Sequence, residues 1–186
     1  MGWAKVSLPM AANAPAEYLI ISASLRSASL SRAMAEALGA AYAKLGVTYQ
    51  LIDLREYVLP LCDGEAAYEH PHVTTLSAII EAARVIVVAT PIYNYDANAT
   101  AKNLLELTGG AWENKTVGFL CAAGGASSYM SIMGLANSLM LDFRCLIIPR
   151  FVYAKGEDFT AKKQPTEDLA ARIVELAEAS VKIRNG

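Results

Sequence analysis

A cluster of hydroxyl groups and one guanidinium lies in the segment SASLRSASLS, residues 22–31, between an apolar run and an amphipathic stretch. A helix start attracts anions, because its first N–H groups lack partners within the helix and its dipole is positive at that end. A terminal phosphate monoester needs many donors around one point, which hydroxyls, N–H groups and a guanidinium provide. The segment therefore predicts a phosphate site, and its candidate donors are Ser24, Arg26, Ser27, Ser29 and Ser31.

A plainer interpretation of the same segment stays open: Ser27 or Ser29 only caps the helix, and the other serines fill a turn. The segment contains no G-x-G-x-x-G, so the dinucleotide fingerprint is absent where it would be expected. The chain also contains no G-x-x-x-x-G-K-[ST], which excludes a nucleoside-triphosphate P-loop.

A second candidate loop, within TPIYNYDANATAKNLLELTG (90–109), follows a buried apolar run and carries Tyr93, Asn94, Tyr95 and Asn98. Aromatic faces and amide edges suit a flat heteroaromatic ligand that has donors and acceptors along its own edge. The alternative is an ordinary turn followed by a solvated helix.

A third candidate loop is CAAGGASSYMS (121–131). Gly124 and Gly125 permit a positive φ or a very close backbone approach, and the small Ala122 and Ala123 leave room for a planar group. Two glycines after a strand are also common in plain turns. Together, the three loops describe a mononucleotide with a wide ring, such as FMN.

Alternating elements are expected to hold these loops at one edge of a sheet. Short apolar runs predict five strands, at 17–23, 48–54, 84–90, 116–122 and 144–150. Helical periodicity follows each of them, at 30–45, 73–83, 99–107, 128–141 and 166–184, with Gly46 ending the first helix. The alternation predicts an α/β fold with a doubly wound, five-stranded parallel sheet, whose ligands bind at the carboxyl ends of the strands.

Composition agrees with a sheet covered by helices on both faces. The chain has 186 residues, of which 54% are hydrophobic and 18% charged, and its mean hydropathy is +0.30. This length suits one compact domain. We expect a loose N-terminal tail at 1–16 and a single domain at 17–186.

Several classes of function are disfavoured by the sequence. The net charge is −2, with no basic cluster to neutralise a row of phosphates, so nucleic acid is not expected as a partner. The apolar runs are far shorter than the ~20 residues that span a bilayer, so no membrane insertion is expected. The odd number of cysteines (Cys62, Cys121 and Cys145) favours buried thiols in a reducing cytoplasm.

Isolated candidates for other chemistry lack supporting residues. His70 and His72 are not completed by a cluster of further ligands at a recognised spacing, so no metal site is predicted. Cys62 next to Asp63 is not linked to either histidine by a motif, which disfavours a Cys/His hydrolase.

The three loops resemble a known family. SLRSASLS (24–31) is similar to the S-L-R-x-x-S-x-x phosphate loop of the NADPH-dependent FMN reductase family, which has a flavodoxin-like fold. PIYNYDANATAKNLLE (91–106) resembles its P-x-Y-N-x-S-x-P-G-x-L-K-N-x-L-D segment, and DLREYVLPLCDGE (53–65) its D-L-x-x-L-P-L-x-D stretch. The similarity spans roughly residues 17–150 and implies the strand order 2-1-3-4-5.

The resemblance implies roles for named residues. Ser24, Arg26, Ser29 and Ser31 would bind the phosphate of FMN; Pro91, Ile92, Tyr93 and Asn94 would lie along the isoalloxazine; and Gly124 and Gly125 would contribute from the third loop. Ser22 falls inside the predicted strand, and Ser27 is then expected as a cap or turn residue. The chain departs from the family at Ala23, which replaces a glycine, at Leu30-Ser31, which replace Phe-Asn, and in DANATAKN, which lacks P-G-x-L.

The implied activity is that of an FMN-dependent NAD(P)H oxidoreductase. Hydride would pass from NADPH or NADH through bound FMN to a small-molecule acceptor, namely a quinone, an azo compound, a metal oxyanion or free flavin. The cofactor carries this chemistry, so no catalytic side chain is predicted. The resemblance also implies a homodimer or homotetramer. The alternatives are a flavodoxin-like electron carrier and a flavin-binding protein without substrate turnover.

Overall fold

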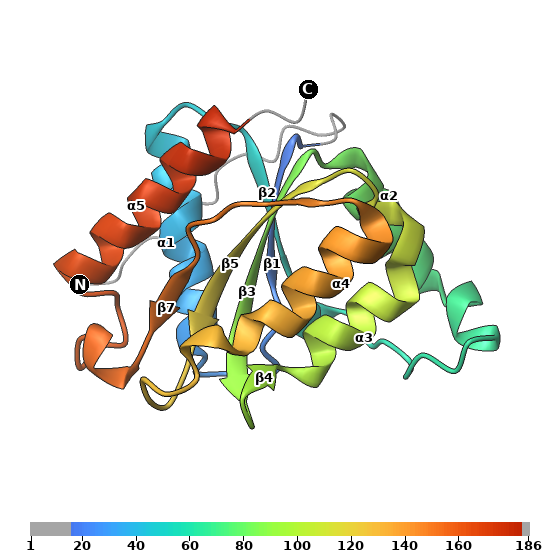
Figure 1. Ribbon diagram of the computed structural model, residues 1–186, viewed down its shortest axis with the longest axis horizontal. Coiled ribbons are helices and arrows are strands. Elements are labelled where there is room, and N and C mark those ends of the chain that lie inside the picture. Colours follow the sequence, from blue (N-terminus) through green and yellow to red (C-terminus); the bar gives the residue numbers. More distant parts are fainter. Residues whose placement is uncertain (1–15, 184–186) are drawn as a thin grey trace, which may run out of the picture.

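A twisted parallel sheet forms the centre of the molecule in a computed structural model that describes residues 16–183 (Figure 1). Its long strands are β1 (Tyr18–Ser22), β2 (Tyr49–Asp53), β3 (Val85–Tyr93) and β5 (Thr116–Ala122). The sheet order is β2-β1-β3-β5-β6, with every neighbouring pair on this path parallel. The predicted order of the five-stranded sheet is confirmed. Of the tail expected at 1–16, only Ala16 is among the described residues.

Of the predicted fifth strand, at 144–150, only residues 146–147 form a strand, and a second short strand follows beyond residue 150. β6 (Leu146–Ile147) pairs with Thr116 and Val117 of β5, whereas β7 (Val152–Ala154) pairs further along, from Leu120 to Ala122. Pro149 lies between them and has no N–H to donate to a ladder. A further two-residue strand, β4 (Asp96–Ala97), pairs antiparallel with the end of β3, so the sheet has seven strands rather than five.

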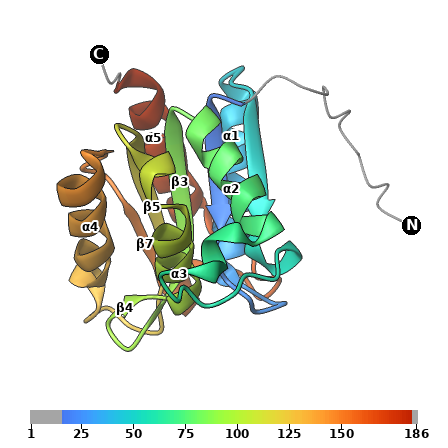
Figure 2. The same cartoon turned by 90° about the vertical axis from the view of Figure 1, so that its right-hand side faces the viewer.

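Helices cover both faces of the sheet (Figures 1 and 2). One face carries α1 (Leu30–Lys44) and α5 (Glu167–Lys182), and the other carries α2 (Pro71–Ala82), α3 (Ala99–Thr108) and α4 (Met133–Phe143). The helix predicted at 128–141 begins as a 3-10 turn, Tyr129–Ile132, before it continues as α4.

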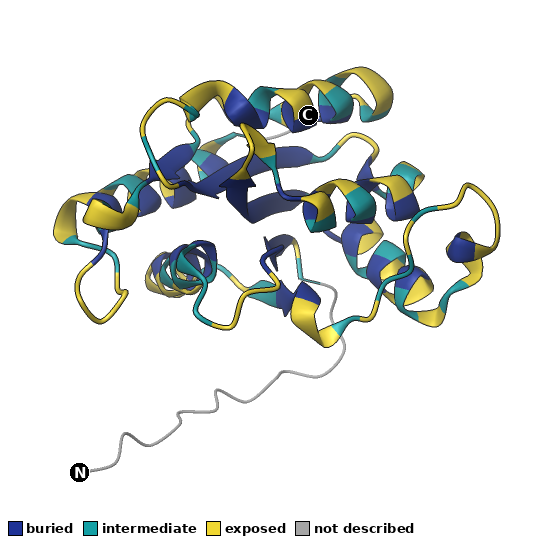
Figure 3. Ribbon diagram, turned by 90° about the horizontal axis from the view of Figure 1, so that it is seen from below, coloured by how far each residue is buried: buried dark blue, intermediate teal, exposed yellow. Residues whose placement is uncertain are grey.

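The strands are apolar on both sides because both faces are covered. Along β1, Leu19 and Ile21 pack under α2 and α3, whereas Ile20 packs under α1. All five residues of β1 and all seven of β5 are buried. Figure 3 shows the result: the strands are buried, and exposure is concentrated in the connecting loops and the outer helix faces.

The first helix begins at the serine-rich loop. Its N-cap is Ser29, whose hydroxyl oxygen accepts from the backbone N–H of Arg32. Ser27, expected as a cap or turn residue, lies in the turn directly before this cap. At the other end, Gly46 has φ +71°, which only glycine adopts without strain, and the helix ends at Lys44. The predicted stop at Gly46 is therefore confirmed.

Because β1, β3 and β5 are parallel, their carboxyl ends meet at one edge, and the three candidate loops follow directly from them. No helix between residues 16 and 183 has the length and apolar character that crossing a membrane requires.

Candidate functional site

A cavity of about 400 Å³ opens between the three loops at the carboxyl edge of the sheet. Its volume falls within the range of about 300–1,000 Å³ that is usual for ligand pockets. Eight of the ten residues carried over from the family line it: Ser24, Arg26, Ser29, Ser31, Pro91, Ile92, Tyr93 and Gly124. Asn94 and Gly125 are not part of its lining.

Four further residues line the cavity. Ala122 and Ala123 were predicted as small residues that leave room for a ring, although not as site residues. Leu30 and Gly156 were not anticipated. Gly156 follows β7 and lies beyond residue 150, where the family motifs quoted above end. The pairing of β7 with β5 brings Gly156 to this edge of the sheet.

The serine loop presents hydroxyl groups whose oxygens already accept bonds from the backbone. Ser24 is 2% exposed, and its Oγ accepts from the N–H of Arg26 at 3.3 Å. Ser29 Oγ accepts from the N–H of Arg32 at 3.1 Å and lies 2.9 Å from Ser31 Oγ. A hydroxyl that accepts such a bond keeps its own hydrogen to donate. One hydrogen is used between Ser29 and Ser31, so Ser24 and one member of that pair can donate O–H groups to an anion while the loop keeps its own bonds.

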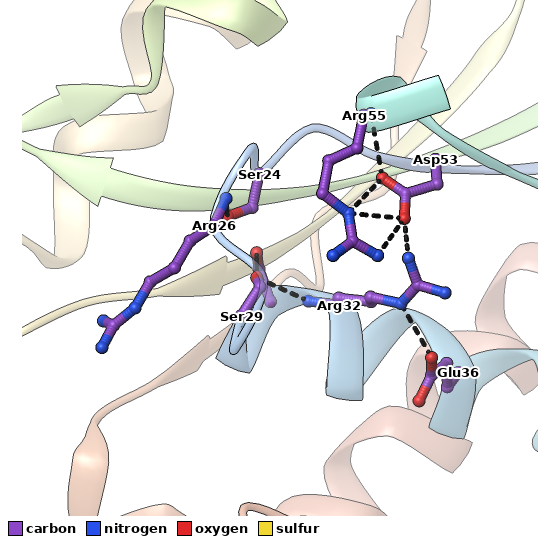
Figure 4. A network of polar contacts seen from close by, with 8 residues as sticks. Ser24, Arg26, Ser29, Arg32, Glu36, Asp53 and Arg55 are labelled. Atoms are coloured by element: carbon purple, nitrogen blue, oxygen red, sulfur yellow. Dashed lines mark hydrogen bonds and ion pairs between the residues drawn. The ribbon is translucent and has the colours of Figure 1, made fainter. Parts of the chain in front are cut away.

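Three arginines lie near this loop, and two of them are held by one buried carboxylate (Figure 4). Asp53, at the end of β2, is 3% exposed. Its Oδ2 accepts from Arg55 Nε at 2.9 Å and from Arg55 Nη2 at 2.6 Å, and it also contacts the guanidinium of Arg32. Arg32 additionally donates to Glu36.

The third arginine is Arg26, which points away from the Asp53 cluster (Figure 4). Among the arginines between residues 16 and 183, it is the one whose guanidinium has no carboxylate partner; the partners of the others are Asp53, Glu17, Glu113, Glu175, Asp158 and Asp168. An unpaired guanidinium at a cavity lined by hydroxyls is suited to an anionic ligand.

The second loop turns sharply after it leaves the cavity wall. Tyr93 pairs with Asp96, so Asn94 and Tyr95 form a two-residue hairpin turn with φ +51° and +67°. Pro91 and Ile92 are buried at the wall, and Tyr93 is 54% exposed. The turn carries Asn94 and Tyr95 past the cavity into exposed positions.

Asn98 of the same loop is buried and faces inward. Its Nδ2 donates to the carbonyl of Ala23 at 2.8 Å, and its Oδ1 accepts from Thr90 Oγ1 at 2.9 Å. It is also the N-cap of α3, accepting from the N–H of Ala101. The predicted amide edge therefore serves the protein's own loops rather than the cavity.

The third loop has an open backbone. A Cβ placed on Gly124 or on Gly125 would meet no atom within 4 Å, so the space beside these residues is empty of protein. Neither glycine has a positive φ, so the positive φ that their sequence would permit is not adopted. The hydroxyl of Tyr153, on β7, donates to the carbonyl of Gly125.

The isolated histidines and the cysteine lie away from the cavity. His70 caps α2 through its Nδ1, and His72 packs edge-on against it. Cys62 donates weakly to the hydroxyl of Tyr68. No group of three or more side chains within 16–183 is arranged to hold a metal ion.

Comparison with known proteins identifies a family. The sequence model described as NADPH-dependent FMN reductase matches residues 17–160. An NAD(P)H-dependent FAD/FMN reductase of Geobacillus thermodenitrificans is 28% identical over 134 residues, which are 70% of this chain and 72% of that protein.

Solved structures with the same fold include a flavoenzyme NAD(P)H:(acceptor) oxidoreductase, FerB, from Paracoccus denitrificans. Its TM-score is 0.72 at 19% identity, with 89% of this chain and 95% of that chain covered. An NAD(P)H:quinone oxidoreductase from Methanothermobacter marburgensis has a TM-score of 0.60 at 19% identity, over 88% of this chain and 98% of that one. At these identities the likeness concerns the fold, and it confirms the expected flavodoxin-like architecture.

Proposed function

The chain belongs to the NADPH-dependent FMN reductase family, whose members use FMN with NAD(P)H as electron donor, and from this premise we propose that the cavity at the carboxyl edge is its FMN site. The protein is a flavin-dependent NAD(P)H oxidoreductase. We further propose that it delivers electrons to a small-molecule acceptor and that it works as a homo-oligomer.

The observation that carries the proposed site is the unpaired guanidinium of Arg26. Arg32 and Arg55 are occupied by Asp53, whereas Arg26 lines the cavity together with Ser24, Ser29 and Ser31. A phosphate monoester bound there would receive a guanidinium, hydroxyl donors and the first N–H groups of α1. The donor set therefore fits the phosphate of FMN.

The remaining lining fits the ring system. Pro91, Ile92 and Tyr93 supply one wall, and Ala122 with Gly124 supplies small residues on another. Space beside Gly124 that a Cβ would fill permits a planar group to approach the backbone closely. Half-exposed Tyr93 lies at the margin of the cavity, where an aromatic ring can stack on a second planar molecule. This favours planar acceptors, such as quinones and azo compounds, over metal oxyanions.

FMN held by these residues would supply the redox chemistry, namely hydride transfer from a nicotinamide and electron transfer to the acceptor. The chain's own residues bind the cofactor and orient it. The described lining contains no Asp, Glu, His, Lys or Cys side chain, so the wall offers no carboxylate, imidazole, amine or thiol for proton transfer. Its buried apolar members, Ile92, Ala122 and Ala123, limit the access of water to the ring.

The test is spectroscopic. The purified protein is loaded with FMN, freed of excess flavin and titrated anaerobically with NADPH and, separately, NADH. We expect a visible flavin band that is bleached by one or both nucleotides and restored by a quinone or an azo dye. A protein that retains no FMN contradicts the proposed site. A flavin that no nucleotide bleaches, but that a reduced partner protein does, would favour an electron carrier. Light scattering on the same sample tests the oligomer.

A further inference from the structure

The side chain of Asn98 lies where two of the three cavity loops meet. It is 5% exposed, and it contacts residues directly before two lining segments. Its amide donates to the carbonyl of Ala23, which precedes Ser24, and accepts from Thr90, which precedes Pro91. Its own backbone N–H donates to Thr90 Oγ1 at 3.3 Å.

Ala23 is held from both sides. Its N–H donates to the carbonyl of Ala89 on β3 at 2.9 Å, and its carbonyl accepts from Asn98 at 2.8 Å. Ala23 is completely buried, so no water competes for that carbonyl. The residue that leads into the phosphate loop is therefore tied to β3 by its backbone and to the start of α3 by one side-chain amide.

This arrangement is a departure of this chain from the family motif. In the alignment of PIYNYDANATAKNLLE with P-x-Y-N-x-S-x-P-G-x-L-K-N-x-L-D, Asn98 stands at the position of proline. Proline has neither a side-chain amide nor a backbone N–H. It could make none of the contacts that Asn98 makes with Ala23 and Thr90.

We propose that Asn98 is the positioning residue of the phosphate loop: through its bond to the Ala23 carbonyl, it sets the place of Ser24 and Arg26 relative to the wall at Pro91. This inference rests on the proposed function, because it assumes that the loop binds the phosphate of FMN. Asn98 does not line the cavity itself and acts through Ala23.

The experiment compares the affinities for FMN and for riboflavin, which lacks the phosphate. Asn98→Ser keeps a side chain that caps helices as well as asparagine does but is too short to reach Ala23. Since a buried carbonyl is then left without a donor, we expect FMN to bind about tenfold more weakly. Riboflavin, which does not use the loop, should change by less than about threefold.

A matched control is Asn103→Ser on the same helix. Asn103 also uses its amide to hold a loop, donating to the carbonyl of Pro60 and accepting from the N–H of Cys62. That loop lies outside the FMN cavity. The control should lose thermal stability without changing the ratio of the two affinities.

The outcomes separate the inference from the proposed function. If the wild-type protein binds FMN no better than riboflavin, the phosphate site itself is wrong. If the wild type prefers FMN and Asn98→Ser keeps that preference unchanged, Asn98 is not a positioning residue. Should Asn98→Ser fail to fold, Thr90→Val removes the hydroxyl that orients the Asn98 amide, and the same ratio is measured; an unchanged ratio in that variant overturns the inference.

Discussion

The hydroxyl of Tyr153 reaches the carbonyl of Gly125, 28 residues earlier in the chain, and so fastens the glycine loop to the edge strand β7. Tyr153 is 8% exposed, and its ring packs edge-on against Tyr129 from the same loop. The loop after β5 therefore owes its position to a residue beyond the fourth helix, which no local pattern in CAAGGASSYMS indicates.

Replacing Tyr153 by phenylalanine removes this one hydrogen bond and keeps the ring. We expect the glycine loop to loosen and FMN to bind about three- to tenfold more weakly, measured by quenching of flavin fluorescence. Tyr42→Phe is the matched control, because Tyr42 is also buried and bonds Ser180 at 2.8 Å between α1 and α5. Equal flavin affinity in the two variants would show that the Tyr153 hydroxyl does not support the site.

The phosphate loop itself is tested by the double variant Ser24→Ala/Arg26→Ala. Hydrogen bonds to charged groups contribute about 1.5–3 kcal/mol each, so FMN affinity should fall at least about a hundredfold. Riboflavin affinity should stay nearly the same. Arg150→Ala removes an exposed arginine that pairs with Glu175 and should leave both affinities unchanged. An equal loss for riboflavin would contradict a phosphate role.

Asp53 is expected to matter for stability, because its buried carboxylate pairs with both Arg32 and Arg55 at the end of β2. Asp53→Asn leaves Arg55 without a carboxylate and Arg32 with only the exposed Glu36, and it should lower the free energy of unfolding by about 1–3 kcal/mol. Glu36→Gln is the control. Because Glu36 is exposed, this substitution should lower the free energy of unfolding by no more than about 0.5 kcal/mol. Denaturant unfolding measures both; equal losses would contradict a special role for Asp53.

Alkaline pH should weaken the fold through Tyr42. Burial raises the pKa of Tyr42 from 10.0 to about 12 in the folded protein. The folded state thus holds this proton more tightly than the unfolded chain. The stabilisation that the protonated Tyr42 gives the folded state is complete below pH 10 and is lost as pH rises to about 12. In Tyr42→Phe the free energy of unfolding should fall less steeply over this interval than in the wild type; parallel profiles would refute the assignment.

The three thiols should differ in reactivity. Burial raises the pKa of Cys121 to about 12 and that of Cys145 to about 11, so almost no thiolate forms at pH 8, and both side chains are buried. Cys62 is half-buried. A thiol reagent at pH 8 should modify Cys62 rapidly and the other two only after unfolding. Rapid labelling of Cys121 in the Cys62→Ser protein would contradict this packing.

The order of the sheet could be predicted from the sequence because each strand is a short apolar run and a helix separates it from the next. The bounds of the fifth strand could not be predicted correctly. Its apolar residues continue through Leu146, Ile147 and Ile148, but Pro149 interrupts the hydrogen bonding with β5. Pairing with β5 resumes only at Val152. A pattern of apolar residues reports burial and does not report which N–H groups are paired.

The site was predictable where it follows from local chemistry. Ser24, Arg26 and Pro91 are recognisable because they come just after the strands predicted at 17–23 and 84–90, although β3 in fact continues through Pro91, and all three line the cavity. Asn98 was recognised as part of the second loop, but its inward orientation depends on the distant carbonyl of Ala23. Gly156 depends on the register between β5 and β7. Contacts of this kind are set by tertiary packing, which one sequence does not reveal.

The division of the last strand also bears on how the molecule behaves in crowded solution. An uninterrupted edge strand offers a row of unpaired N–H and C=O groups to which another chain can add. Here that border is broken into segments of two and three residues, β6 and β7, with Pro149 between them. The interruption that detaches β6 from β7 therefore also protects this border of the sheet against edge-to-edge aggregation.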